Sequence, residues 1–164
     1  MASTATAPKT TPVFSPDQLL ANWTGNRALT RRVFDAFPEK ELFSFSVSGM
    51  RTAAVLGQEL LAIGAPGMRQ IIFGEQEQLN EGIDLKNSKA ELLRLWDEAT
   101  EEIINLWAQL PEDSFSKEVL AFGMYPGTGW SQIAYYIDNE IHHRGQMYVY
   151  LRALGIEPPF FWEK

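Results

Sequence analysis

Apolar side chains recur every three or four residues in four segments of the chain, and this spacing predicts four amphipathic helices. The segments lie at about residues 16–37, 50–74, 89–110 and 129–154. Four long helices in a chain of 164 residues predict one all-α domain built as a four-helix bundle. The connections, of about 12 to 20 residues, are longer than the usual bundle loops. We therefore expect long crossover connections rather than a simple up-and-down order.

Local signals mark the ends of these helices. Ser15 is a predicted N-cap followed by a proline, and Pro38 ends the first helix. Ser88 and Glu91 match a capping box at the start of the third helix. Gly155 suits the position that follows the last turn of the fourth helix.

The remaining segments predict no regular structure. Residues 1–14, rich in Thr, Ala and Pro, are expected to form a flexible arm, which leaves 15–164 as the domain. Residues 40–49 alternate apolar and small polar side chains, as a strand would, but no second strand of similar quality can pair with them. We predict an extended connection there and an irregular segment at 111–129. Pro66 is expected to kink or break the second helix.

Composition excludes several classes of function. The net charge of −7, the pI near 4.8 and the scattered basic residues argue against nucleic acid as a partner. The absence of cysteine excludes disulfides, thiolate metal sites and cysteine nucleophiles. No uncharged apolar stretch is long enough for a membrane span, and the N-terminus lacks the apolar core of a signal peptide. We expect a cytoplasmic protein without a membrane or nucleic-acid partner.

Candidate chemistry is concentrated in DNEIHHRGQMYVYLRALG, residues 138–155, which contains both histidines of the chain. Neighbouring helical residues point about 100° apart, so His142 and His143 cannot face one site in the same way. Asn139 and His143 have the i,i+4 spacing that lets two side chains hold one ion. Glu140 and His143 match the Glu-x-x-His pair of di-iron bundles. That centre needs a second such pair, and no histidine is left to supply it.

The helical pattern also predicts the surroundings of these residues. One row of the fourth helix is expected to form a structural face, made of Ile133, Ile137, Ile141, Tyr148 and Leu151. The neighbouring row is expected to line a polar cavity, with Tyr136, Asn139, His143, Met147 and Tyr150. We predict that Glu140 and Arg144 form a solvated ion pair and that a close helix crossing explains Gly145. The aromatic tail after Pro159 is expected to pack on the bundle or across a dimer.

The segment NEIHHRGQMYVYLRALGIEPP resembles the C-terminal signature of the DinB-like superfamily of bacterial four-helix-bundle proteins. That signature has a histidine, three residues, a second histidine, Arg-Gly-Gln, a further arginine and Gly-x-x-Pro-Pro. The stretch GMRTAAVLGQELLAIG resembles the superfamily's second helix, where an arginine leads into a third histidine. The resemblance implies a left-handed bundle, frequently dimeric, with a divalent metal such as zinc or nickel on three histidines. Some relatives use that metal to activate a low-molecular-weight thiol.

Carried over position by position, the resemblance assigns one ligand position to His143 and places Asn139 where another histidine should be. Gln58 stands at the position in the second helix, or Glu59 if the register differs by one residue. Neutral amide oxygens suit hard cations rather than the borderline metals that imidazole favours. We therefore expect a degraded or altered metal site of His143, Asn139 and Gln58, joined by hydrogen bonds. Glu59 and His142 are the alternative ligands that would restore it.

Three functions remain open at this point. The first is a DinB-family protein of unspecified role, in binding or thiol-linked stress chemistry, with an altered three-histidine site. The second is a metal-dependent low-molecular-weight-thiol S-transferase that uses His143 with Glu59 or His142. The third is a non-catalytic dimeric interaction protein. We expect a homodimer, a small molecule or thiol as ligand, and one zinc or nickel ion if the altered site still binds metal.

Overall fold

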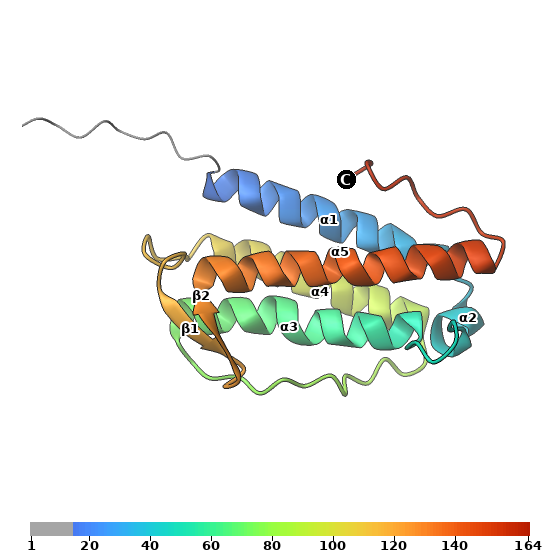
Figure 1. Cartoon of the computed structure of the whole chain (residues 1–164), viewed down its shortest axis with the longest axis horizontal. Coiled ribbons are helices and arrows are strands. Elements are labelled where there is room, and N and C mark those ends of the chain that lie inside the picture. Colours follow the sequence, from blue (N-terminus) through green and yellow to red (C-terminus); the bar gives the residue numbers. More distant parts are fainter. Residues whose placement is uncertain (1–14) are drawn as a thin grey trace, which may run out of the picture.

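The computed structural model describes residues 15–164, so the arm expected at residues 1–14 lies outside the described residues. Within this range four long helices form a bundle (Figure 1): α1 (Pro16–Ala36), α3 (Ala53–Phe73), α4 (Lys89–Trp107) and α5 (Gly129–Ala153). The smaller elements of the same range are helix α2 (Glu39–Ser44) and strands β1 (Glu118–Ala121) and β2 (Tyr125–Thr128). The predicted all-α bundle is confirmed.

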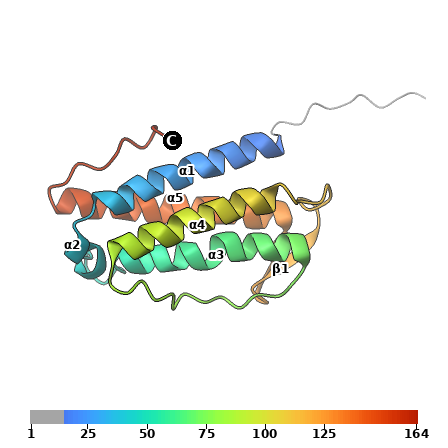
Figure 2. The same ribbon diagram turned by 180° about the vertical axis from the view of Figure 1, so that it is seen from behind.

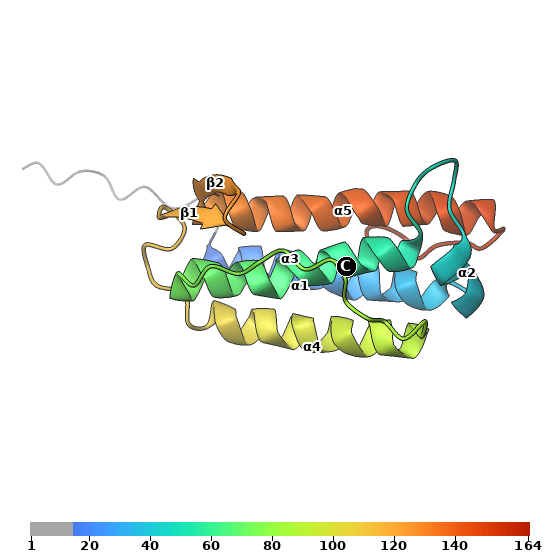
Figure 3. The same cartoon turned by 90° about the horizontal axis from the view of Figure 1, so that it is seen from below.

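The order of the helices around the bundle requires long connections. Helices α1 and α3 each pack against both α4 and α5, so α1 and α3 occupy opposite corners, with α4 and α5 at the other two (Figure 3). Helices α3 and α4 run in the same direction, and the segment 74–88 returns along the length of the bundle to join them (Figures 1 and 2). The predicted crossover is confirmed, and this segment covers one side of α3.

The predicted helix ends are largely confirmed. The Ser15 side chain accepts from the Gln18 backbone N–H, and the two residues form a complete capping box. Ser88 caps α4 by accepting from Glu91 N–H at 3.3 Å. The reciprocal half of that box does not form, because the Ser88 N–H donates to the Leu85 carbonyl instead. Gly155, with φ of 75°, follows the last turn of α5.

The expected break at Pro66 is wrong, because α3 continues through it without interruption. A helical proline removes one backbone hydrogen bond, and α3 tolerates this loss because it is buried between α4 and α5 along most of its length. The neighbouring Gly67 has a separate role. A Cβ atom there would lie 2.4 Å from the hydroxyl oxygen of Tyr136, so glycine allows the tyrosine ring to lie against α3.

Two short elements were not expected. Residues Glu39–Ser44 form helix α2 rather than an extended connection, and the Leu42 side chain of this helix is buried. The segment expected to be irregular contains an antiparallel hairpin that pairs β1 with β2. Its second strand has the sequence YPGT, and Pro and Gly are poor strand formers. This explains why the sequence pattern did not predict the hairpin.

The predicted faces of α5 are partly correct. Ile133, Ile137 and Leu151 are buried as expected, but Ile141 is 40% exposed. The row expected to line a polar cavity supplies much of the apolar core instead, since Tyr136, Met147 and Tyr150 are buried in it. The cavity described below opens only at the end of this row near the hairpin.

Glu140 and Arg144 form the expected ion pair, with Arg144 Nη1 3.8 Å from Glu140 Oε1. The pair is not solvated as expected, because both side chains are buried. The Thr30 hydroxyl donates to Glu140 Oε1 at 2.6 Å, and Arg27 Nη1 lies 3.9 Å from Glu140 Oε2. Arg144 Nη2 donates to Asn26 Oδ1 at 2.8 Å. Burial lowers the pKa of Arg27 to about 10, against the opposing effect of Glu140. This buried network joins α1 to α5 through charged hydrogen bonds.

The C-terminal tail turns back along α1 (Figure 1), where Arg32 Nη1 pairs with Glu163 Oε2 at 3.2 Å. Its aromatic side chains are not buried by the other residues of the described range, since Phe160, Phe161 and Trp162 are 49%, 65% and 64% exposed. The expected contact across a dimer stays a prediction. In the described part of the chain, no helix has both the length and the apolarity that a membrane crossing requires.

Candidate functional site

Helices α3 and α5 bring three of the predicted residues together. Glu59 Oε1 accepts from His143 Nε2 and from Asn139 Nδ2, each at 3.0 Å. The other oxygen, Oε2, lies 2.5 Å from Nη1 of Arg51, which precedes α3. Asn139 and His143 lie one turn apart on α5, so both reach the same carboxylate. We call Arg51, Glu59, Asn139 and His143 the Glu59 cluster.

Of the two registers considered for the second helix, the structure places Glu59 in the site. Gln58 points elsewhere, because side chains on a helix turn by about 100° per residue. Its Nε2 donates to the Ile83 carbonyl at 2.6 Å. Gln58 therefore fixes the segment 74–88 against α3 and does not contact His143.

His142 also lies outside the cluster. It is exposed, and its Nε2 lies 3.2 Å from the amide nitrogen of Gln146. That contact orients the Gln146 amide so that its oxygen faces His143 Nδ1 at 2.9 Å. Both ring nitrogens of His143 therefore lie within hydrogen-bond distance of side-chain oxygens, and these two contacts fix the orientation of the ring.

The charge of Glu59 is stabilised where it lies. Burial by itself would raise the pKa of this carboxyl group, but hydrogen bonds from His143, Asn139 and Arg51 hold the pKa below its usual value. Glu59 is therefore ionised at neutral pH.

Sequence reasoning missed the roles of Arg51 and Gln146. Gln146 follows His143 by three residues on the helix, and that spacing was the available signal.

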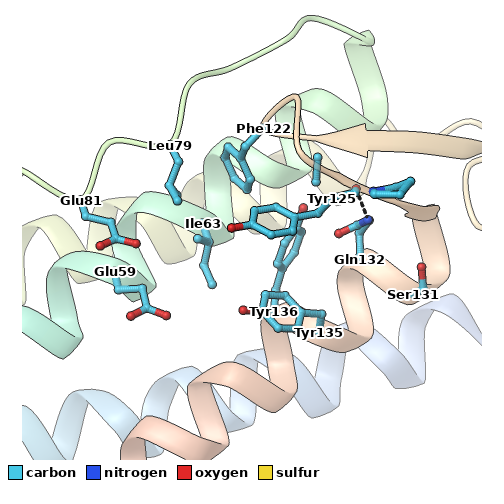
Figure 4. A pocket seen from close by; sticks show the side chains of 12 residues that line it. Glu59, Ile63, Leu79, Glu81, Phe122, Tyr125, Ser131, Gln132, Tyr135 and Tyr136 are labelled. Atoms are coloured by element: carbon cyan, nitrogen blue, oxygen red, sulfur yellow. Dashed lines mark hydrogen bonds between the residues drawn. The ribbon is translucent and has the colours of Figure 1, made fainter. Parts of the chain in front are cut away.

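Next to the Glu59 cluster lies a pocket of about 360 Å³ between α3, α5, the hairpin and the segment 74–88. Figure 4 shows Glu59 and Glu81 at one end, Ser131 and Gln132 at the other, and tyrosine rings between them. Gln132 Nε2 donates to the Tyr125 carbonyl at 2.9 Å and so ties the hairpin to α5. The pocket is lined by Glu59, Ile63, Leu79, Glu81, Ala121, Phe122, Tyr125, Pro126, Ser131, Gln132, Tyr135 and Tyr136.

Two tyrosines give the pocket a distinctive polarity. Tyr136 is only 3% exposed, and its hydroxyl has no hydrogen-bond partner among residues 15–164. Burial raises the pKa of this hydroxyl. The pKa of Tyr135 is also raised, first by burial and then by the negative charges of Glu59 and Glu81. A buried hydroxyl without a partner is unusual in a folded protein, and this one lies against Gly67 of α3.

The Glu59 cluster does not fit a divalent metal held by three histidines. Catalytic zinc sites take three strong protein donors, whereas this cluster offers one imidazole, one carboxylate and one amide. Asn139 directs its NH2 group to the carboxylate, and the guanidinium of Arg51 would repel a divalent cation. Among the residues that the structure describes, no three His, Asp or Glu side chains are grouped to hold a metal ion.

The chain is thus a four-helix bundle protein with a polar cluster between α3 and α5 and a pocket beside it. The chain belongs to the DinB family, whose model matches residues 3–163. This match confirms the resemblance to the DinB-like superfamily that the fourth-helix motif indicated. No curated protein sequence matches the chain.

Solved structures support the same fold. A DinB-like protein from Bacillus subtilis has 21% identity and a TM-score of 0.69, and the match covers 90% of this chain and 99% of that one. A DinB-like protein from Bacillus cereus has 16% identity and a TM-score of 0.69, covering 89% and 97%. A mycothiol-dependent maleylpyruvate isomerase has 14% identity and a TM-score of 0.60, and the match covers 81% of this chain but only 61% of the isomerase.

Proposed function

We propose that this chain is a small-molecule-binding member of the DinB family that works without a bound metal. The pocket beside Glu59 is the binding site, and the Glu59 cluster is its fixed polar end. The observation that carries this proposal is the saturation of the Glu59 carboxylate by three donors, one of them the guanidinium of Arg51.

The charges support a cluster that needs no metal. A metal ion in such a site would neutralise the carboxylate and order its ligands. Here Arg51 supplies positive charge 2.5 Å from Glu59 Oε2, and His143 and Asn139 donate to the other oxygen. A preformed, partly aromatic pocket with a few polar groups at fixed positions is the usual form of a small-molecule site.

Ligand-observed NMR with a library of small aromatic and polar fragments, in buffer containing EDTA, tests this function. We expect fragments to bind the wild-type chain without metal and to lose binding in Leu79→Trp, which fills the pocket from the segment 74–88. Leu93→Trp, on a half-buried position of α4 away from the pocket, is the control and should keep binding. The proposal fails if no fragment binds, or if binding requires an added metal.

One arrangement favours a second candidate, a metal-dependent thiol S-transferase. His143 Nε2 and the Glu59 carboxylate already lie side by side, and together they could supply two ligands if Arg51 moved away. The structural similarity to a mycothiol-dependent isomerase fits this candidate. The two functions differ in whether the purified chain retains a metal ion that depends on His143.

A further inference from the structure

We propose that the pocket binds a small organic cation, an amine or quaternary ammonium compound with apolar substituents, between the carboxylate of Glu81 and the tyrosine rings. This inference rests on the proposed function, because it names the ligand class of the same pocket. Its support comes from the charge, the aromatic lining and the size of the pocket.

The charged groups that line the pocket are all negative. Glu59 and Glu81 are both at one end (Figure 4), and no Lys, Arg or His is among the lining residues. Arg51 and His143 contact Glu59 but do not line the pocket. Glu81 is exposed, so its charge is available to a ligand. Because Arg51 already pairs with Glu59, Glu81 is the carboxylate that would attract a cationic ligand and repel an anionic one.

The aromatic lining matches the same ligand class. The rings of Tyr125, Tyr135, Tyr136 and Phe122 surround the space between the two ends of the pocket. The faces of such rings attract ammonium groups, and several rings around one space are the usual recognition site for quaternary ammonium. Apolar substituents of the ligand would contact Ile63 and Leu79.

Tyr136 contributes only part of its ring to the pocket wall, because its hydroxyl lies against Gly67 of α3. The volume of about 360 Å³ admits one small molecule.

A set of probes that differ in charge tests the proposal by isothermal titration calorimetry on the full chain. The cations are choline and benzyltrimethylammonium, the neutral analogue of choline is 3,3-dimethylbutan-1-ol, and the anionic analogue is 3,3-dimethylbutanoate. We expect at least one cation to bind about tenfold more tightly than either analogue. Glu81→Gln should weaken this binding about three- to tenfold, while Glu75→Gln, on the same segment but outside the pocket, should not.

Two results would overturn the inference about the ligand and leave the proposed binding function standing. If the alcohol or the carboxylate binds as tightly as the cations, the pocket binds ligands but does not select positive charge. If fragments bind in the NMR test and neither cation does, the ligand class is wrong and the binding function stands. Absence of binding in both experiments would remove both proposals.

Discussion

Asn139 stands at a position where the resemblance to the DinB-like superfamily implies a histidine ligand. It lies one turn from His143 and donates to the same oxygen of Glu59. The sequence alone predicted that Asn139 and His143 belong to the site. It could not decide between Gln58 and Glu59, because α3 is buried on nearly every side and its apolar pattern does not show which face points to the site. Arg51 could not be placed either, since it precedes the helix and only the fold brings it to Glu59.

Asn139→His should create zinc binding. Two imidazoles one turn apart, with Glu59, would form the His2Glu donor set of catalytic zinc sites. We expect zinc affinity by calorimetry at pH 7.5 to rise at least about tenfold over wild type. Asn139→Ala, which adds no donor, is the control. Equal zinc affinity in the wild type and in Asn139→His would contradict our description of the cluster.

Glu59→Gln should change how stability depends on pH. The pKa of Glu59 is lowered in the folded chain, so its contribution is present above the unfolded pKa, near 4.5, and is lost as the pH falls through the folded pKa. At pH 7 we expect the variant to be about 1 kcal/mol or more less stable, because charged hydrogen bonds are lost. The difference in urea-unfolding free energy should shrink as the pH falls below 4.5. A difference that does not change with pH would show that Glu59 carries no stabilised charge.

At the scale of elements, the long helices were predictable because their caps and apolar spacing agree. The hairpin was not, because its second strand contains Pro and Gly and is stabilised by contacts with α5, such as the Gln132 bond to the Tyr125 carbonyl. The two helical glycines near the site also differ. A Cβ at Gly67 meets Tyr136, whereas a Cβ at Gly145 meets nothing within 4 Å. The close helix crossing expected at Gly145 is therefore wrong.

Matched alanine substitutions should separate these two glycines. Gly67→Ala places a methyl group against the Tyr136 ring and should destabilise the chain by about 1–3 kcal/mol. Gly145→Ala should stabilise it by up to about 1 kcal/mol, because alanine is the better helix former and the space is open. Urea unfolding of both variants measures this. If the two variants change the free energy of unfolding in the same direction, Gly67 is not needed for the packing of Tyr136 against α3.

For the whole molecule, the buried network of Arg27, Glu140 and Arg144 is the main connection that sequence reasoning missed. A Glu and an Arg at i,i+4 look the same whether solvent or another helix faces them. Their partners Asn26 and Thr30 lie on α1, more than 100 positions away in the sequence. The network holds α1 against α5, and so supports the helix that carries Asn139 and His143.

Removing the carboxylate of this network should be strongly destabilising. Glu140→Gln leaves Arg27 and Arg144 buried without an anionic partner, and we expect a loss of about 3–5 kcal/mol in urea unfolding. Glu101→Gln, at an exposed position of α4, is the control and should have little effect. A loss below about 1 kcal/mol would mean that solvent or local rearrangement compensates the two guanidinium groups.

The measurement that tests the central claim most directly is the metal content of the purified, tag-free chain. Plasma mass spectrometry would be run before and after equilibration with zinc, nickel and manganese, on wild type and His143→Ala. Our account predicts far less than one metal ion per chain in both proteins, because Arg51 and hydrogen bonds already satisfy Glu59. Close to one ion per wild-type chain, lost in His143→Ala, would contradict it and favour the metal-dependent S-transferase.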